Sequence, residues 1–248
     1  MTESLYILTG ASRGLGAALA EQLVQQAGTT LLGLSRTPHP KLDALARAAG
    51  TRCEQWPVDL ADPLAAAARL GVWLTAQDGA HFASATLINN AAALPRIALL
   101  EASDATELSR VVRVGLEAPL LLTAGFLRAT RDWAATRKVL NISSGLGRQP
   151  MAAQVAYCAV KAGLDHATRA LALEGGARVV SIAPGVIDTD MQTALRGSDP
   201  AGFPDHALFV EMKQRGQLDA PAATARRLLA YLQRADFGRQ PVADVRDA

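Results

Sequence analysis

Short apolar runs alternate with longer stretches rich in alanine and leucine along the chain. Each apolar run is nearly continuous rather than alternating with polar residues. Strands of this kind are covered on both faces, which is typical of a parallel sheet lying between two layers of helices. The pattern predicts strands at residues 5–10, 29–35, 53–58, 85–90, 138–143 and 178–184.

The stretches between these runs are long enough for crossover helices, for example residues 14–26 and 108–129. We therefore expect an α/β fold with a doubly wound (Rossmann) parallel sheet and helices on both faces, formed as a single domain over residues 1–248. Residues 188–220 interrupt the rhythm with several glycines and prolines, and we expect this stretch to form a substrate lid.

Composition narrows the range of partners. Half of the 248 residues are hydrophobic, 19% are charged and the net charge is +2, which favours neither disorder nor a broad nucleic-acid surface. Two cysteines, Cys53 and Cys158, cannot form a disulfide framework or a zinc cluster, so no metal site is predicted. The N-terminus lacks a signal-peptide pattern, and no apolar run approaches the ~20 residues of a membrane helix. We expect a cytoplasmic protein whose partners are small molecules or further copies of itself.

We expect the functional residues directly after the strands, because ligands of doubly wound sheets bind beyond the carboxyl ends of the strands. The first such turn is TGASRGLG, residues 9–16, which follows a predicted strand and opens a predicted helix. Its glycines allow the backbone to approach a pyrophosphate at the helix N-terminus. A tight strand-to-helix turn favours glycine whether or not a ligand binds there, so the glycines alone are weak evidence for a cofactor site. The expected cofactor contacts here are Gly10, Ser12, Arg13, Gly14, Leu15 and Gly16.

The end of the second strand predicts which nicotinamide cofactor is preferred. An enzyme that prefers NAD usually carries an acidic residue there to hold the ribose 2′-hydroxyl. This chain has Ser35 and Arg36 instead, and Arg36 together with Arg13 can pair with a 2′-phosphate, so NADP(H) is predicted. After the third strand, Asp59 and Leu60 are expected near the adenine, although Asp59 is equally suited to cap the next helix. Asn89, Asn90 and Ala91, where the fourth strand ends, are also expected cofactor contacts.

The segment SSGLGRQPMAAQVAYCAVK, residues 143–161, carries the predicted proton chemistry. Tyr157 and Lys161 are four residues apart and so share one helical face, while Ser144 follows the fifth strand. A phenol has an ordinary pKa of about 10, and a neighbouring ammonium favours the phenolate. We expect Tyr157 to act as the acid and base, with Ser144 bonding the substrate oxygen. The alternative is that both helical residues simply face solvent.

Together, TGASRGLG, NNAA, Ser144 with YCAVK, and PGVIDT resemble the short-chain dehydrogenase/reductase family in order and spacing over nearly the whole chain. The resemblance implies that Lys161 lowers the pKa of Tyr157 and binds the nicotinamide ribose. It also implies that the nicotinamide end contacts Pro184, Gly185, Ile187, Thr189 and Met191. The chain departs from the family pattern at Gly115, where an asparagine commonly supports a proton relay.

Within the family, the C-terminal third resembles the sepiapterin reductases, and bacterial benzil reductases show the same likeness. The resemblance implies that Asp244 anchors a pterin ring, whereas the alternative is a merely polar strand end. To reach substrate, the final segment must fold back as an edge strand anchored by Pro241, Val242 and Val245. The predicted substrate contacts are Ser144, Gly145, Tyr157, Gly185 and Asp244.

These expectations combine into an NADPH-dependent carbonyl reductase that acts on a ketone, a vicinal dicarbonyl or a pterin side chain and forms a homodimer. Sepiapterin-type and benzil-type substrates both stay open. A different class of function is a non-catalytic NADP-binding sensor, but the intact Ser144, Tyr157 and Lys161 argue against it. A third possibility is that the apolar face of the helix carrying Tyr157 serves only in dimerisation.

Overall fold

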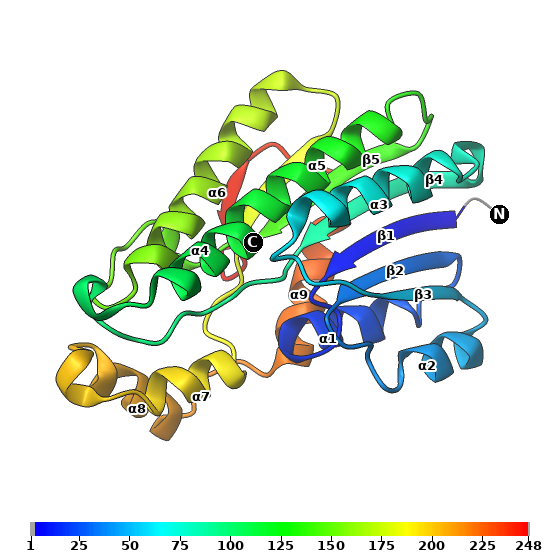
Figure 1. Cartoon of the computed structure of the whole chain (residues 1–248). Coiled ribbons are helices and arrows are strands. Elements are labelled where there is room, and N and C mark those ends of the chain that lie inside the picture. Colours follow the sequence, from blue (N-terminus) through cyan, green and yellow to red (C-terminus); the bar gives the residue numbers. More distant parts are fainter. Residues whose placement is uncertain (1–2, 248) are drawn as a thin grey trace.

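One parallel sheet organises the chain. A computed structural model describes residues 3–247, and its seven strands lie in the order β3-β2-β1-β4-β5-β6-β7 (Figure 1). All neighbouring strands run parallel. The strands are β1 Glu3–Thr9, β2 Thr29–Ser35, β3 Arg52–Pro57, β4 Phe82–Asn89, β5 Thr136–Ile142, β6 Arg178–Ala183 and β7 Val242–Asp244. The doubly wound parallel fold expected from the sequence is confirmed.

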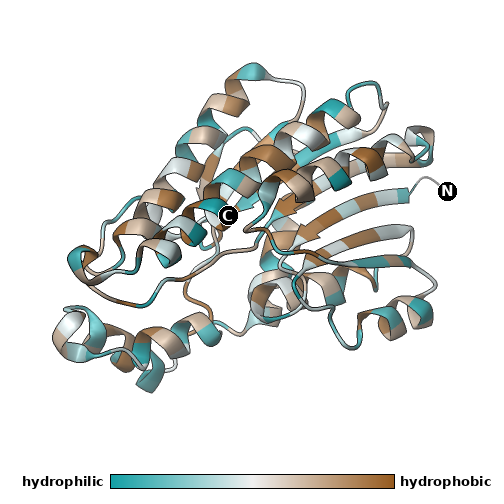
Figure 2. Ribbon diagram, viewed as in Figure 1, coloured by the Kyte–Doolittle hydropathy of each residue, from teal (hydrophilic) through white to brown (hydrophobic). Residues whose placement is uncertain are grey.

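Helices cover both faces of this sheet, as the continuous apolar strands predict. On β1, Leu5 and Ile7 face one apolar core, whereas Tyr6 and Leu8 face the other, because successive side chains of a strand point to opposite faces. One face is covered by α1 (Gly14–Leu23), α2 (Leu42–Ala49) and α9 (Pro221–Leu232); the other is covered by α3 (Pro63–Thr75), α4 (Ala105–Val112), α5 (Ala118–Ala129) and α6 (Val155–Glu174) (Figure 1). Figure 2 shows apolar residues recurring along the strands and the helices that pack on them.

Short helical turns link these elements. They are η1 Gly79–His81, η2 Leu100–Ala102, the π-helical η3 Arg113–Glu117, η4 Gly145–Gly147 and η5 Pro200–Gly202. Among the described residues, no helix is long and apolar enough to cross a membrane.

The segment 188–220 lies apart from the two helix layers. It forms α7 (Asp190–Arg196) and α8 (His206–Gln214), which Figure 1 shows beside the body of the fold. Leu195, Phe203 and Phe209 form a small core with Ala153, the residue two positions before α6. A single bridge between Ile187 and Asp219 closes the base of the segment. The segment therefore begins after β6 and packs against the residues before α6.

The C-terminal strand is the seventh member of the sheet. β7 pairs with β6 at the edge, with Asp244 opposite Ala183, and the amide of Val245 donates to the carbonyl of Ala183 at 2.9 Å. Val245 is buried. The expectation of an anchored edge strand here is confirmed.

Candidate active site

A cleft of about 1160 Å³ lies at the carboxyl ends of the strands. It brings together residues that follow six different strands, as a doubly wound sheet requires. Among the residues predicted to bind the cofactor, those that line the cleft are Gly10, Ser12, Arg13, Gly14, Leu15, Gly16, Arg36, Asp59, Leu60, Asn90, Ala91, Tyr157, Lys161, Pro184, Ile187, Thr189 and Met191. Asn89, Ser144, Gly145, Gly185 and Asp244 are not part of its lining.

The glycine turn is held closed by the segment after β4. Gly10 has a φ of +71°, and a Cβ there would lie 3.0 Å from Nδ2 of Asn90. That amide nitrogen donates to the carbonyls of Thr9 and Gly10. A Cβ on Gly16 would lie only 1.9 Å from the carbonyl oxygen of Gly10, so no larger residue fits the turn. Small residues thus keep the backbone open to the cleft, which fits a pyrophosphate group.

The N-terminus of α1 also points to anion binding. Its N-cap residue, Arg13, makes no side-chain capping bond, so the first backbone amides of the ten-residue helix have no side-chain acceptor. Such amides and the helix dipole favour a negatively charged ligand. The glycine turn and this helix end together suit the phosphates of a dinucleotide.

Two arginines stand at the rim predicted to hold the ribose. Arg36 is exposed and lines the cleft directly after β2. Arg13 also lines it, and its Nη1 lies 2.9 Å from Oδ2 of Asp190, the first residue of α7. This pair links the glycine turn to the segment 188–220 and was not predicted from sequence. The donor set fits a phosphorylated ribose better than a free 2′-hydroxyl.

Asp59 was predicted either to lie near the adenine or to cap the next helix, and the structure decides against the cap. Asp62, not Asp59, caps α3, because its Oδ1 accepts from the amide of Ala65. Asp59 accepts from the amide of Ala61 at 3.0 Å and pairs with Arg110 of α4. The Ala61 amide, assisted by Arg110, holds the pKa of the Asp59 carboxyl below its ordinary value. The capping alternative was therefore wrong, and Asp59 remains on the cleft wall.

Ser144, Tyr157 and Lys161 come together as the spacing predicts. Tyr157 and Lys161 are both buried on one face of α6, so the solvent-facing alternative is excluded. Ser144, the second residue after the end of β5, lies close enough to the Tyr157 hydroxyl to lower the pKa of that phenol. Nζ of Lys161 lies 5.6 Å from the centre of the Tyr157 ring and donates to the carbonyl of Ile142 at 2.7 Å.

The electrostatics of this group differ from the expectation. Burial raises the pKa of Tyr157 to about 12, and the Ser144 hydrogen bond only partly opposes the rise. Burial also lowers the pKa of Lys161 to about 8, which nearby Asp165 opposes. The predicted net lowering of the Tyr157 pKa is not found, because the cost of burying the phenolate outweighs the groups that favour it, and the Lys161 ammonium bonds the Ile142 carbonyl. Tyr157 is consequently protonated at neutral pH and is set up as a proton donor.

Gly115 lies where the family pattern commonly has asparagine, and the structure gives the packing reason for glycine. It sits in the π-helical turn η3, and a Cβ there would lie 2.5 Å from Cγ1 of Val160. Val160 precedes Lys161 on α6, so its methyl group fills the space of a side chain at position 115. An asparagine-based relay has no room at this position.

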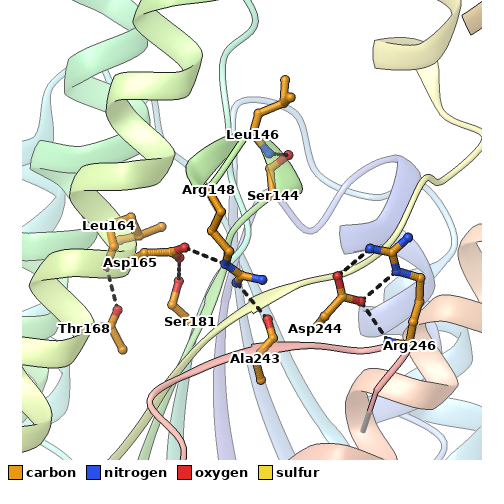
Figure 3. A network of polar contacts seen from close by, with 10 residues as sticks. All are labelled: Ser144, Leu146, Arg148, Leu164, Asp165, Thr168, Ser181, Ala243, Asp244 and Arg246. Carbon is orange, nitrogen blue, oxygen red and sulfur yellow. Dashed lines mark hydrogen bonds and ion pairs between the residues drawn. The ribbon is translucent and has the colours of Figure 1, made fainter. Parts of the chain in front are cut away.

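Both carboxylate oxygens of Asp244 already accept hydrogen bonds from Arg246. The Asp244 side chain is 11% exposed, and Arg246 donates from Nε to Oδ1 at 2.8 Å and from Nη2 to Oδ2 at 2.7 Å (Figure 3). The Arg246 guanidinium, as the main cause, holds the pKa of the Asp244 carboxyl below its ordinary value. The arginine stem passes Gly185, with its Cδ 3.9 Å from the position of a Cβ there. We expected the Asp244 carboxylate to face the nicotinamide. In the structure it is paired with Arg246 instead.

Sequence reasoning missed part of the cleft wall. The segment Ala92–Arg96 continues from Asn90 and Ala91 and lines the cleft, as do Thr37, Pro38 and Pro40 after β2. For the first group, the available signal was that these residues continue directly from the NNAA motif at the end of the fourth strand. For Arg246, the signal was an arginine two residues after an acidic residue on a strand end.

Comparison with known proteins agrees with this site. The chain matches the short chain dehydrogenase family over residues 5–199. It is 31% identical over 236 residues to the (S)-benzoin-forming benzil reductase of Bacillus cereus, covering 93% of this chain and 94% of that protein. It is 34% identical over 252 residues to the sepiapterin reductase of Mus musculus, covering 93% and 92%. The crystal structure of a metagenomic short-chain oxidoreductase in complex with NADP has a TM-score of 0.70 and 26% identity, covering 98% of this chain and 95% of that one.

A parallel doubly wound sheet with a glycine turn, and with Ser144 beside the buried Tyr157 and Lys161 at its carboxyl edge, defines an oxidoreductase that uses a nicotinamide cofactor. The chain belongs to the short-chain dehydrogenase family, and its relatives are reductases of small molecules.

Proposed function

We propose that the chain is an NADPH-dependent carbonyl reductase that reduces a ketone or a vicinal dicarbonyl. The observation that carries this proposal is the buried Tyr157 side chain, which lines the cleft beside Ser144 and lies one helical turn from Lys161. A bound nicotinamide supplies a hydride to the carbonyl carbon. Ser144 hydrogen-bonds the carbonyl oxygen, and Tyr157 gives that oxygen its proton. Lys161 stabilises the negative charge left on the phenol.

The preference for NADPH rests on the ribose corner. Arg13 and Arg36 line it, and Ser35 stands where an enzyme using NAD usually has an acid. The glycine turn and the N-terminus of α1 hold the phosphates, and Asp59 with Leu60 borders the adenine. Pro184, Gly185, Ile187, Thr189 and Met191 follow β6 at the nicotinamide end.

Two substrate types are supported by relatives, whose names include benzil reductase and sepiapterin reductase. Both substrates carry neighbouring carbon–oxygen groups, which suits one proton donor and one hydride site. The Arg246 pair on Asp244 favours the diketone, because both carboxylate oxygens already accept from the guanidinium and do not face a pterin edge as a free pair. A pterin substrate requires the Asp244–Arg246 pair to open first.

We further propose that the segment 188–220 acts as a lid over the substrate end of the cleft. The Arg13–Asp190 pair supports this role, since it fastens the start of α7 to the cofactor turn. The chain is also proposed to act as a homodimer through α5 and α6. Exposed apolar side chains on these helices, Leu120, Val155 and Leu173, support that assembly.

A substrate panel tests the proposed activity. Loss of NADPH absorbance is followed with benzil, sepiapterin and a simple monoketone, for the parent protein and for Tyr157→Phe. We expect turnover of benzil by the parent and a loss of roughly 10²- to 10⁴-fold in the variant, because the variant lacks the positioned acid. NADPH affinity, measured by fluorescence titration, should change little. Normal turnover by Tyr157→Phe contradicts the assignment, and binding of NADPH without reduction of any carbonyl favours the sensor alternative.

A further inference from the structure

A buried carboxylate on α6 lies one helical turn behind the proton-transfer group. Asp165 lies one helical turn beyond Lys161 and is 1% exposed. Its Oδ1 accepts from the Ser181 hydroxyl of β6 at 2.6 Å, and its Oδ2 accepts from Nε of Arg148 at 3.2 Å (Figure 3). A charge this deeply buried is costly unless it is paired and hydrogen-bonded, and here it is both.

Arg148 joins three elements through one guanidinium. It directly follows η4, four residues after Ser144. Besides its bond to Asp165, its Nη2 donates to the carbonyl of Ala243 in β7 at 2.8 Å, and Figure 3 shows the guanidinium lying between α6 and that strand. The planar fork of an arginine can hold two acceptors in fixed directions, whereas a lysine ammonium cannot span both.

The turn between Ser144 and Arg148 is seated closely on α6. A Cβ on Gly147 would lie 3.0 Å from the Lys161 carbonyl and 3.2 Å from Oδ2 of Asp165. The turn also orients the serine, because the amide of Leu146 donates to the Ser144 hydroxyl oxygen at 3.2 Å. A shift of η4 away from α6 therefore moves Ser144 relative to Tyr157.

We infer that Arg148 and Asp165 are positioning residues: their ion pair holds η4 on α6 so that Ser144 stays beside Tyr157, and the same guanidinium fixes β7 to that point. We call the contacts of Arg148 with Asp165 and Ala243 the clamp. The consequence for turnover rests on the proposed carbonyl reduction, whereas the clamp itself does not. Asp165 has a second effect in the same direction, since its charge favours the ammonium form of Lys161.

Hydrogen exchange tests the clamp independently of activity. In Arg148→Leu, we expect faster amide exchange in two separated segments, 145–149 and 242–246. Arg169 is an exposed arginine of α6, and the control variant Arg169→Ala should leave exchange in both segments unchanged. Arg148→Lys keeps a charge beside Asp165 but cannot also reach Ala243, so it should restore protection in 145–149 and not in 242–246. Unchanged exchange in both segments of Arg148→Leu overturns the inference, whatever the protein reduces.

Kinetics then test the consequence. In Arg148→Leu, kcat for benzil should fall roughly 10- to 100-fold with KM and NADPH affinity altered less than about threefold, because misplacing a reacting group costs rate rather than binding. Arg148→Lys should recover most of kcat. A change in KM alone, or a lower melting temperature with normal kcat per folded molecule, would reduce the pair to a structural contact.

A double-mutant cycle separates a joint action from two independent ones. Asp165→Asn keeps the shape of the side chain but turns an amide donor toward the arginine. If the pair acts as a unit, Arg148→Leu combined with Asp165→Asn should lose no more kcat than the more damaging single change. Multiplying losses would contradict the clamp.

Discussion

Burial sets the protonation states of Tyr157 and Lys161 by shifting their pKa values in opposite directions. The phenol is held protonated by a pKa of about 12, while the ammonium is lost near pH 8. In the direction of reduction the phenol must give a proton, so its raised pKa keeps the acid form present throughout the neutral range. The lysine limits the upper end of that range, because its charge stabilises the phenolate that proton transfer leaves behind.

This order of pKa values predicts a pH profile. The kcat for carbonyl reduction should be level below about pH 8 and fall above it as Lys161 loses its proton, well before Tyr157 titrates. Lys161→Arg is the informative comparison, since a guanidinium stays charged beyond pH 12. That variant should lose the fall above pH 8 even if its overall rate is lower. A fall that persists in Lys161→Arg would assign the titration to another group.

At the ribose corner, the prediction concerns a single exposed guanidinium. Arg36→Ala should weaken NADPH binding by about 1.5 to 3 kcal/mol, the range for a lost charged hydrogen bond, and leave NADH binding nearly unchanged. Arg47→Ala, an exposed arginine on α2, serves as the control. Fluorescence titration of both cofactors gives the four affinities. Equal losses for the two cofactors, or a parent preference for NADH, would show that the corner does not read the 2′-phosphate.

At the scale of elements, the packing of η3 on α6 explains the missing asparagine. The space beside Gly115 is filled by Val160, so Gly115→Asn should lower the free energy of unfolding by about 1 to 3 kcal/mol through overpacking. Adding Val160→Ala should recover a large part of that loss, because it removes the methyl group in conflict. Urea unfolding of Gly115→Asn, Val160→Ala, the double variant and the parent measures this. Unchanged stability of Gly115→Asn would mean that the two elements separate easily.

The C-terminal strand carries a prediction about substrate choice. Asp244→Asn should raise the KM for sepiapterin at least tenfold, about 1.4 kcal/mol, and leave benzil reduction nearly unchanged. Arg246→Ala should act in the opposite sense and lower the KM for sepiapterin, since it releases both carboxylate oxygens. Initial rates for the two substrates decide the matter. An equal response of both substrates to Asp244→Asn would make the residue structural.

At the scale of the whole molecule, the fold could be predicted almost completely. The continuous apolar strands determine a sheet buried on both faces, and residues after the strands must then meet at one edge. The same logic assembled the glycine turn, Tyr157 and Lys161. It could not assign Asp59 or the pKa of Tyr157, because these depend on individual contacts to Ala61 and Arg110 and on complete desolvation. The Asp244–Arg246 and Arg148–Asp165 pairs depend on side-chain directions that no periodicity encodes.

The most direct test of the account is deuteride transfer from NADPH labelled at the nicotinamide C4 to benzil, followed by mass spectrometry of the product. Carbonyl reduction by this site predicts one deuterium at the carbinol carbon of benzoin, and product formation reduced at least ~100-fold in Tyr157→Phe, which lacks the acid. NADPH binding by that variant should be unchanged. Unlabelled benzoin, or labelled benzoin formed equally fast by Tyr157→Phe, would contradict the account.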